Sequence, residues 1–309
     1  MKKNTIALMM LFSICIILTA GCVDNQNSSD GVGNMSGDMI VAVTVLPQAE
    51  FVEKIAGDNV EVIVMVPPGA DLHSYEPSPG QLRDLSNAKL YAMMGSGISI
   101  EDSMIAKIAD LNPDMLIIDC SQGIIMSEME AHEGEDEHAV TDGHEGETSM
   151  DPHIWTSPAN VKLMVETIYE GLVELDPENE TTYLENKNAY LAELDALDEQ
   201  IKATLSGKEG SSFMVYHPAW GYFAKQYGLI QVSVEIEGKE PSVRDMQNII
   251  DEANEKNIKV IFVQTGFSTV SASAIANEIG GEVVEVDPLA KDYIENLAKV
   301  AEAFEKGLA

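Results

Sequence analysis

The stretch FMVYHPAWGYFAKQYGLIQVSVEI, residues 213–236, contains the smallest unit of the fold that the sequence predicts. The β-rich run Phe213–Tyr216 predicts a strand, Trp220–Tyr227 a helix and Ile230–Ile236 a second strand. A strand, a helix and a strand in succession favour a parallel sheet covered by helices on both faces. The alternation continues to the C-terminus through a helix over Ser242–Lys256, a strand over Lys259–Val263, a helix over Val270–Ile279, a strand over Glu282–Val286 and a helix over Tyr293–Lys306.

A similar alternating block comes earlier in the chain. Its predicted strands are Ile40–Val45, Val60–Val66, Leu90–Met93 and Met115–Asp119, and its predicted helices are Gln48–Ala56, Pro79–Asn87 and Ile100–Ala109. Ser157 and Pro158 then predict a helix start, and a longer helix follows Pro177, with apolar residues three and four apart. The sequence therefore predicts an α/β protein with an N-terminal lobe over residues 39–175, a long linking helix over 176–207 and a C-terminal lobe over 208–309.

A short repeated motif suggests that the two lobes are related. Glu76-Pro77-Ser78 opens a predicted helix in the first lobe, and Glu240-Pro241-Ser242 opens one in the second. Each motif comes shortly after a strand, and this equivalent position favours a pseudo-symmetric pair of lobes over a chance match.

The first residues predict export from the cytoplasm. Two lysines precede an apolar run over residues 5–20, and small residues precede Cys22, which is the pattern of a secretory signal peptide over residues 1–21. The cysteine directly after Ala-Gly resembles a lipoprotein lipobox, which implies cleavage before Cys22 and a lipid on its thiol. The alternative is a signal-anchor helix, because the apolar run is just short of the usual spanning length. Residues 22–38, rich in Asn, Ser, Gly and Asp, then predict a flexible tether that holds the protein on the outer face of the cytoplasmic membrane.

The charge of the chain limits its partners. The 309 residues include 18 Lys and Arg against 52 Asp and Glu, for a net charge of −34. Nucleic acid is excluded as a likely partner because phosphate binding needs a basic surface, and the acidity argues against docking on anionic lipid. A cation is the ligand that such a field attracts, while the alternative reading of the bulk charge is adaptation to salt.

The three cysteines form no disulfide in the predicted mature chain. Cys15 leaves with the signal, Cys22 is the anchor and Cys120 remains alone. Cys120 ends an apolar run, so we expect it to be a small buried residue.

Three of the six histidines and one aspartate indicate a metal site. His73, His153 and His217 lie in polar, proline-flanked contexts at predicted strand-to-helix junctions, and Asp287 ends the last predicted strand in the same way. Ligands of open α/β sheets bind outside the carboxyl ends of the strands, so two facing lobes would bring these groups to one cleft. Three imidazoles and one carboxylate suit tetrahedral Zn²⁺. For any single histidine the alternative is a capping or satisfied surface residue, and the four junctions together favour the metal.

The other three histidines, His132, His138 and His144, lie in an acidic low-complexity stretch within a predicted loop over residues 121–150. Such a stretch has no apolar face and predicts a mobile loop. Histidine-rich acidic tracts capture divalent metal weakly. The alternative is a solvated insertion that keeps the surface charged.

Taken together and in order, these motifs resemble the substrate-binding lipoproteins of zinc ABC transporters, within the zinc and manganese metal-binding solute-binding protein family. The resemblance runs from the lipobox to the C-terminus. The matching segments are His73–Pro79, Asp151–Trp155, Tyr216–Phe223, Glu240–Ser242 and Asp287–Leu289.

The resemblance implies two Rossmann-like lobes joined by one rigid helix, with a metal between them held by His73, His153, His217 and Asp287. Manganese-binding relatives tend to have a glutamate in place of His217, and a nitrogen there favours zinc. Asp287 is either a direct ligand or yields its position to water. The loop is more acidic than histidine-rich. This composition differs from that of a dedicated metal-trapping loop.

We therefore expect an extracytoplasmic zinc receptor, monomeric and not an enzyme, that delivers Zn²⁺ to an ABC transporter permease. The sequence contains no Walker A motif, so the chain does not hydrolyse the ATP itself. A manganese or iron receptor of the same fold is one alternative. A zinc hydrolase is another, with Glu76 or Glu240 as its general base, but the sequence has no His-Glu-x-x-His helix and Asp287 would close the fourth metal position. An adhesin role is also attached to some family members, and these residues give no signal for it.

Overall fold

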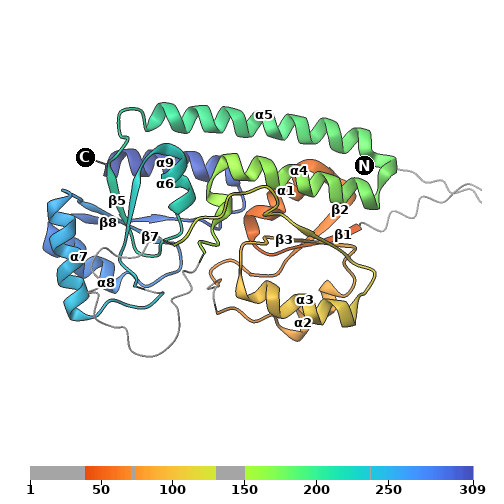
Figure 1. The fold of residues 1–309 in the computed structure, drawn as a ribbon, viewed down its shortest axis with the longest axis horizontal. Helices are drawn as coiled ribbons and strands as arrows, with labels where there is room; N and C mark the ends of the chain where they lie inside the picture. The colour runs from red at the N-terminus through yellow and green to blue at the C-terminus, as the bar shows by residue number, and fades with distance from the viewer. Residues whose placement is uncertain (1–38, 71, 73, 130–149, 237, 309) are drawn as a thin grey trace, which may run out of the picture. The chain divides into compact units, whose positions relative to one another are not determined.

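Two four-stranded sheets form the framework of the part of the chain that the structure describes (Figure 1). The structure is a computed structural model and describes residues 39–70, 72, 74–129, 150–236 and 238–308. The predicted signal peptide, the tether and most of the acidic loop lie outside these residues. None of the helices in the described ranges has the length and apolar character needed to cross a membrane.

The first sheet has the strand order β2-β1-β3-β4, and each pair of neighbours is parallel. Its elements in chain order are β1 (Met39–Val43), α1 (Leu46–Ala56), the 3₁₀ turn η1 (Gly57–Asn59), β2 (Val60–Val64), α2 (Pro79–Leu85), β3 (Leu90–Met93), α3 (Ser99–Leu111) and β4 (Leu116–Asp119). The register pairs Val43 of β1 with Val64 of β2 and with Ala92 of β3. The three strands therefore end together, and the loops that follow them lie at one edge of the sheet.

The second sheet repeats this order as β6-β5-β7-β8, again with parallel neighbours. Its elements are β5 (Ser212–Val215), α6 (Gly221–Tyr227), β6 (Ile230–Ser233), α7 (Val243–Glu255), β7 (Val260–Gln264), α8 (Val270–Ile279), β8 (Glu282–Val286) and α9 (Tyr293–Gly307). The fold class predicted from the sequence, two α/β lobes with parallel sheets flanked by helices, is confirmed.

The repeated Glu-Pro-Ser motif occupies equivalent positions in the two topologies. Ser78 caps α2, which leads from β2 to β3, and Ser242 caps α7, which leads from β6 to β7. Each serine hydroxyl accepts the backbone N–H of the third helical residue, and that residue's side chain accepts the N–H of the serine. The common strand order and these matching caps support the predicted pseudo-symmetry.

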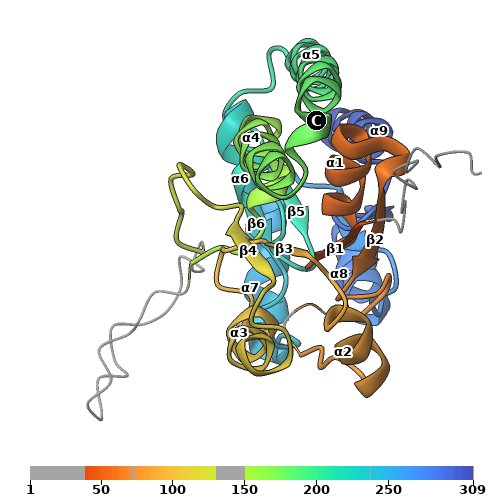
Figure 2. The same cartoon turned by 90° about the vertical axis from the view of Figure 1, so that its right-hand side faces the viewer.

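Between the sheets the chain forms two consecutive helices, α4 (Pro158–Leu175) and α5 (Glu180–Thr204), preceded by the 3₁₀ turns η2 (Ile154–Thr156) and η3 (Pro177–Asn179). Ser157 caps α4 through the N–H of Asn160, as its position before Pro158 predicts. The 25-residue helix α5 packs against α4, α1 and α9, a group of helices that Figure 2 shows nearly end-on.

The central strand β5 buries side chains on both of its faces. Phe213 and Val215 of β5 join the core formed with α9, whereas Met214 between them joins a second core under α7 and α8. This two-residue alternation is the strand period. It explains why the strands are almost wholly apolar and why helices flank the second sheet on both sides.

A buried polar joint ties the segment around η2 to the second sheet. The indole Nε1–H of Trp155 donates to the carbonyl of Pro288 at 2.7 Å, and the hydroxyl of Tyr293 donates to the carbonyl of Trp155 at 2.9 Å. The hydroxyl of Tyr222 donates to the carbonyl of Asp151 at 3.1 Å. These bonds fix the polypeptide on both sides of residue 153 relative to the loops of the second sheet.

Candidate metal centre

The candidate centre lies where the loops after the strands of the second sheet meet the segment that leads into η2. His217 comes two residues after β5, Glu235 two residues after β6, and Gln264 is the last residue of β7. His153 reaches the same place from the first sheet, after β4 and the segment that follows it. His153, His217 and Gln264 meet at a cavity of about 10 Å³, which has room for about one water-sized sphere. Its lining consists of Leu72, His153, Trp155, His217, Gln264, Phe267, Pro288 and Leu289.

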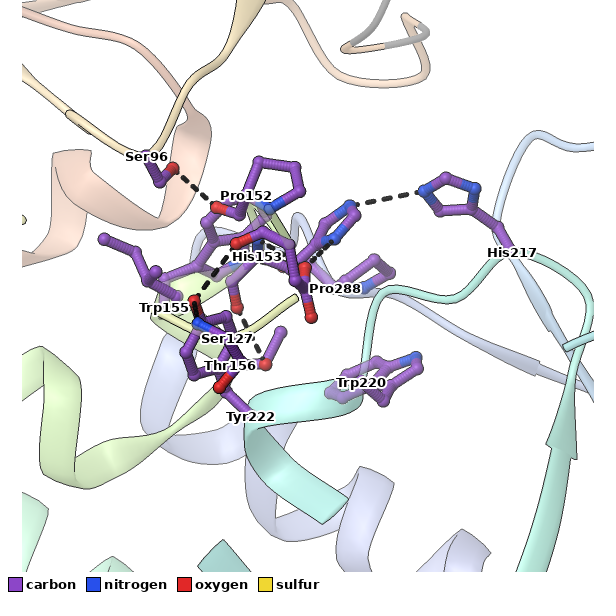
Figure 3. A network of polar contacts seen from close by, with 12 residues as sticks. Ser96, Ser127, Pro152, His153, Trp155, Thr156, His217, Trp220, Tyr222 and Pro288 are labelled. Atoms are coloured by element: carbon purple, nitrogen blue, oxygen red, sulfur yellow. Dashed lines mark hydrogen bonds and ion pairs between the residues drawn. The ribbon is translucent and has the colours of Figure 1, made fainter. Parts of the chain in front are cut away.

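Two of the predicted ligands face one another in this cavity (Figure 3). The Nε2 atoms of His153 and His217 lie 3.2 Å apart, and their ring planes are inclined by 76°. Both residues are buried, at 2% and 8% exposure. The structure therefore brings together two histidines that lie 64 positions apart in the sequence.

Each of these rings is held from behind by a carboxylate. Oδ1 of Asp151 lies 2.7 Å from Nδ1 of His153 and also accepts the backbone N–H of His153 at 2.9 Å. Oε2 of Glu235 lies 2.7 Å from Nδ1 of His217. Because an ionised carboxylate only accepts, these contacts assign the ring proton to Nδ1 and leave Nε2 as the acceptor on the cavity side.

Burial favours the neutral form of His153. The pKa of His153 is lowered, chiefly because burial disfavours the imidazolium, although the hydrogen bond and charge of Asp151 act in the opposite direction. The electrostatic interaction of His153 with His217 acts in the same direction as burial. A neutral imidazole is the form that binds a metal ion.

Apolar side chains surround the two rings. Phe267 stacks on His217 with centroids 5.9 Å apart, and Trp155 lies 5.3 Å from the ring of His153. Leu72, Pro288 and Leu289 complete the wall. A low-dielectric wall of this kind strengthens the attraction between a cation and the donors that hold it.

Asp287, the fourth predicted ligand, is not brought into this pair. The carboxylate of Asp287 accepts the backbone N–H of Leu289 at 2.8 Å, and the cavity lining includes its two neighbours but not Asp287 itself. Burial raises the pKa of this carboxyl. Within the described residues, no group of three or more His, Cys, Asp and Glu side chains is arranged to hold a metal ion.

Several predicted residues cannot be compared with this geometry. His73, the loop histidines His132, His138 and His144, and the anchor Cys22 all lie outside the described residues. Leu72, the neighbour of His73, is described and lines the cavity. Cys120 is described and fully buried, as predicted.

Sequence reasoning missed the two carboxylates that contact the histidines. Asp151 had a signal, because a carboxylate two residues before a histidine can bond both its ring and its backbone N–H. Glu235 had only an indirect one, since it follows the strand next to the strand of His217. A comparison of the residues that follow the ends of neighbouring strands identifies Glu235 as a candidate. Gln264, the last residue of β7, and Phe267, which follows that strand, were missed for the same reason.

Comparison with known proteins shows the family to which the chain belongs. The model of the family described as "ZnuA: Zinc-uptake complex component A periplasmic" matches residues 41–307. The high-affinity zinc uptake system protein ZnuA of Bacillus subtilis is 31% identical over 97% of this chain and 91% of its own length. The manganese-binding lipoprotein MntA of Halalkalibacterium halodurans is 25% identical over 100% of both chains.

Solved structures of ZnuA are also similar to this chain. A crystal structure of ZnuA is 41% identical, covers 87% of this chain and 98% of its own, and superposes with a TM-score of 0.79. A ZnuA deletion mutant with zinc bound is 40% identical, covers 88% of this chain and 98% of its own, and superposes with a TM-score of 0.78.

Proposed function

Because the chain belongs to the family of periplasmic A components of zinc-uptake complexes, we propose that it captures Zn²⁺ outside the cytoplasm and delivers it to the permease of an ABC importer. The family is one of uptake-complex components and not of enzymes, so the prediction of a non-enzymatic role is confirmed.

The observation that carries the proposal is the 3.2 Å separation between the Nε2 atoms of His153 and His217. In a tetrahedral site with Zn–N bonds of about 2.0–2.1 Å, two ligand nitrogens lie about 3.3–3.4 Å apart. The two imidazoles therefore stand close to the spacing of two zinc ligands. Two imidazole nitrogens at this distance can bind one cation together, and a borderline divalent metal ion is the cation that imidazole prefers.

We propose His73 as the third ligand and Asp287 as the fourth. Support for His73 comes from Leu72, which lines the cavity one residue before it. Asp287 is supported by Pro288 and Leu289, which line the cavity directly after it. Its carboxylate would exchange the N–H of Leu289 for the metal, or leave the position to water.

The proposal extends to the anchoring and to the acidic loop. The predicted lipid on Cys22 would tether a monomeric receptor to the outer face of the membrane, and a lipoprotein relative supports this reading. The loop that carries His132, His138 and His144 would capture zinc weakly and exchange it quickly. Deleting residues 132–147 is then expected to abolish weak additional binding and to leave one tight site, as a zinc titration monitored by calorimetry would reveal. Loss of the tight site would instead make the loop part of the structure of the centre.

A manganese receptor is the second candidate, because one relative is named for manganese binding. The described donors argue for zinc, since both are imidazole nitrogens and manganese is better served by carboxylate and carbonyl oxygen. An additional oxygen donor from Asp287 would reduce the preference for zinc over manganese.

The test is a chelator-competition titration of metal-free protein starting at Gly37, the first residue of the compact unit that contains both sheets. Zn²⁺ and Mn²⁺ are titrated side by side. One tight zinc site with manganese binding weaker by orders of magnitude supports the proposal. Equal affinities would make the protein a general divalent-metal receptor, and the lack of any tight site would refute metal capture at this cavity.

A further inference from the structure

We propose that Asp151 and Glu235 are positioning residues, each of which fixes one histidine as its Nδ1–H tautomer so that both Nε2 lone pairs point into the same cavity. The inference deepens the proposed zinc binding and rests on it. Neither carboxylate is a metal ligand in this arrangement, because each lies on the side of its imidazole opposite the Nε2 atom.

A tautomer needs to be fixed because a neutral imidazole can carry its proton on either ring nitrogen. With the proton on Nε2, the ring presents a donor to the cavity and cannot bind a cation there. A carboxylate at Nδ1 removes this choice, since it accepts a hydrogen bond and cannot donate one. It also makes the opposite nitrogen more basic and orients the ring.

Asp151 is itself held in one orientation. Its side chain is 5% exposed, and Oδ1 receives both the ring and the backbone N–H of His153. Its other oxygen, Oδ2, packs against Gly221 at the start of α6, where a Cβ would come within 2.6 Å. The carbonyl of Asp151 accepts the hydroxyl of Tyr222. The carboxylate is therefore fixed from the side of the second sheet and cannot rotate away from the imidazole.

Glu235 is held by the strand that carries its histidine. Its backbone N–H donates to the carbonyl of Tyr216 at 3.0 Å, and its carbonyl accepts the hydroxyl of Ser233 at 3.2 Å. Its side chain is 11% exposed where it meets Nδ1 of His217. The end of β6 thus orients a ring attached to the end of β5.

The two carboxylates form a matched set. One comes from the segment before η2 and the other from the second sheet, and both contacts measure 2.7 Å. Two histidines held in this way have their Nε2 atoms 3.2 Å apart. We infer that the fold keeps the pair ready for a cation before the cation arrives.

The test combines zinc affinity with the protonation pattern of the rings. In metal-free protein starting at Gly37 and labelled with ¹⁵N-histidine, long-range ¹H–¹⁵N spectra at pH 8 report which ring nitrogen carries the proton. The unaltered protein is expected to show His153 and His217 as Nδ1–H tautomers. Glu235→Ala removes the acceptor at His217, so this ring alone becomes a mixture of tautomers and zinc affinity falls by about 10–100-fold. Glu235→Gln keeps a carbonyl acceptor and recovers part of the loss.

The matched control is Asp198→Asn. Asp198 is also a buried carboxylate, but it accepts from Gln226 and Tyr227 and touches neither histidine. This variant is expected to keep both tautomers and the unaltered zinc affinity. Asp151→Asn is the parallel variant for His153, and because that aspartate has several buried contacts, Glu235→Ala carries the test by itself.

The outcomes separate this inference from the proposed function. Unchanged tautomers and zinc affinity within about twofold in Glu235→Ala would overturn the positioning role while leaving zinc capture intact. Absence of zinc binding in the unaltered protein would refute the proposed function. The tautomers of the metal-free rings would then still decide whether the carboxylates fix them.

Discussion

At the scale of single residues, the described donors of the candidate centre are two imidazole nitrogens, so His217→Ala removes one metal bond. Zinc sites with four ligands have binding free energies of about 10–16 kcal/mol, or about 3 kcal/mol per ligand. We therefore expect His217→Ala to weaken tight zinc binding by about 100-fold or more, measured by chelator competition. His138→Ala, in the acidic loop, is the control and should leave the tight site unchanged. Equal losses in the two variants would contradict the assignment of the cavity.

The lowered pKa of His153 predicts how the stability of the metal-free protein depends on pH. An unfolded histidine takes up its proton near pH 6.5, whereas the folded protein resists protonation of His153 until lower pH. Below about 6.5 the unfolded state therefore binds more protons, and the free energy of unfolding falls as the pH decreases. Urea unfolding between pH 7.5 and 5 measures this slope. His153→Gln should reduce it, and an unchanged slope in the variant would mean that another group causes the loss.

At this scale, the sequence predicted those residues whose neighbours along the chain give a recognisable signal. His153 follows Pro152 and His217 precedes Pro218, and both were predicted as ligands from these contexts. Glu235 was missed, because its contact with His217 comes from the register of β5 and β6 and not from spacing along the chain.

At the scale of secondary-structure elements, one buried carboxylate holds the loop that follows β3. Glu101, in the first turn of α3, is 1% exposed and accepts the N–H groups of Met94 and Gly95 and the hydroxyl of Thr44. In the same loop, the hydroxyl of Ser96 donates to the carbonyl of Pro152, directly before His153. The loop therefore links the first sheet to the candidate centre.

We expect Glu101→Gln to destabilise the protein by about 1–3 kcal/mol, because its amide NH₂ would face one of the donors that now meet a carboxylate oxygen. Urea denaturation measures the loss. Asp102→Asn, a neighbouring exposed position on the same helix, is the control and should change stability by less than about 0.5 kcal/mol. A loss of similar size in both variants would mean that the charge of the helix start, and not the loop contact, is responsible.

The elements themselves were largely predictable from pattern. Leu90–Met93, Val270–Ile279 and Glu282–Val286 have the bounds that apolar runs and helical spacing predict. The strand predicted over Ile230–Ile236 is shorter, ending at Ser233. After that residue Ile236 pairs with Lys239 instead, so the backbone turns and Glu235 faces His217. A continuous β-rich run does not reveal such a turn, because the residues remain favourable for a strand.

At the scale of the whole described molecule, the two candidate ligand histidines, His153 and His217, belong to segments that the chain separates by α4 and α5. A metal ion that binds both of them joins the segment before η2 to the second sheet. The sequence could predict this meeting from the strand ends, but not its distance. That distance depends on the buried bonds of Trp155, Tyr222 and Tyr293 across the joint.

Because the unfolded chain has no preformed site, zinc should stabilise the folded protein by mass action. Free zinc at 100 times its dissociation constant adds about 2.7 kcal/mol to the free energy of unfolding. For a chain of this size, that corresponds to a rise in melting temperature of about 4–5 °C. Differential scanning calorimetry at a series of buffered zinc concentrations measures this rise. The matched control Asp198→Asn should show the full shift, whereas a variant with both His153→Ala and His217→Ala should show none. A zinc-dependent shift that persists in the double variant would locate the tight site away from this cavity. No shift in the unaltered protein would mean that zinc does not join the two segments, because a cation held by both histidines cannot bind without opposing their separation.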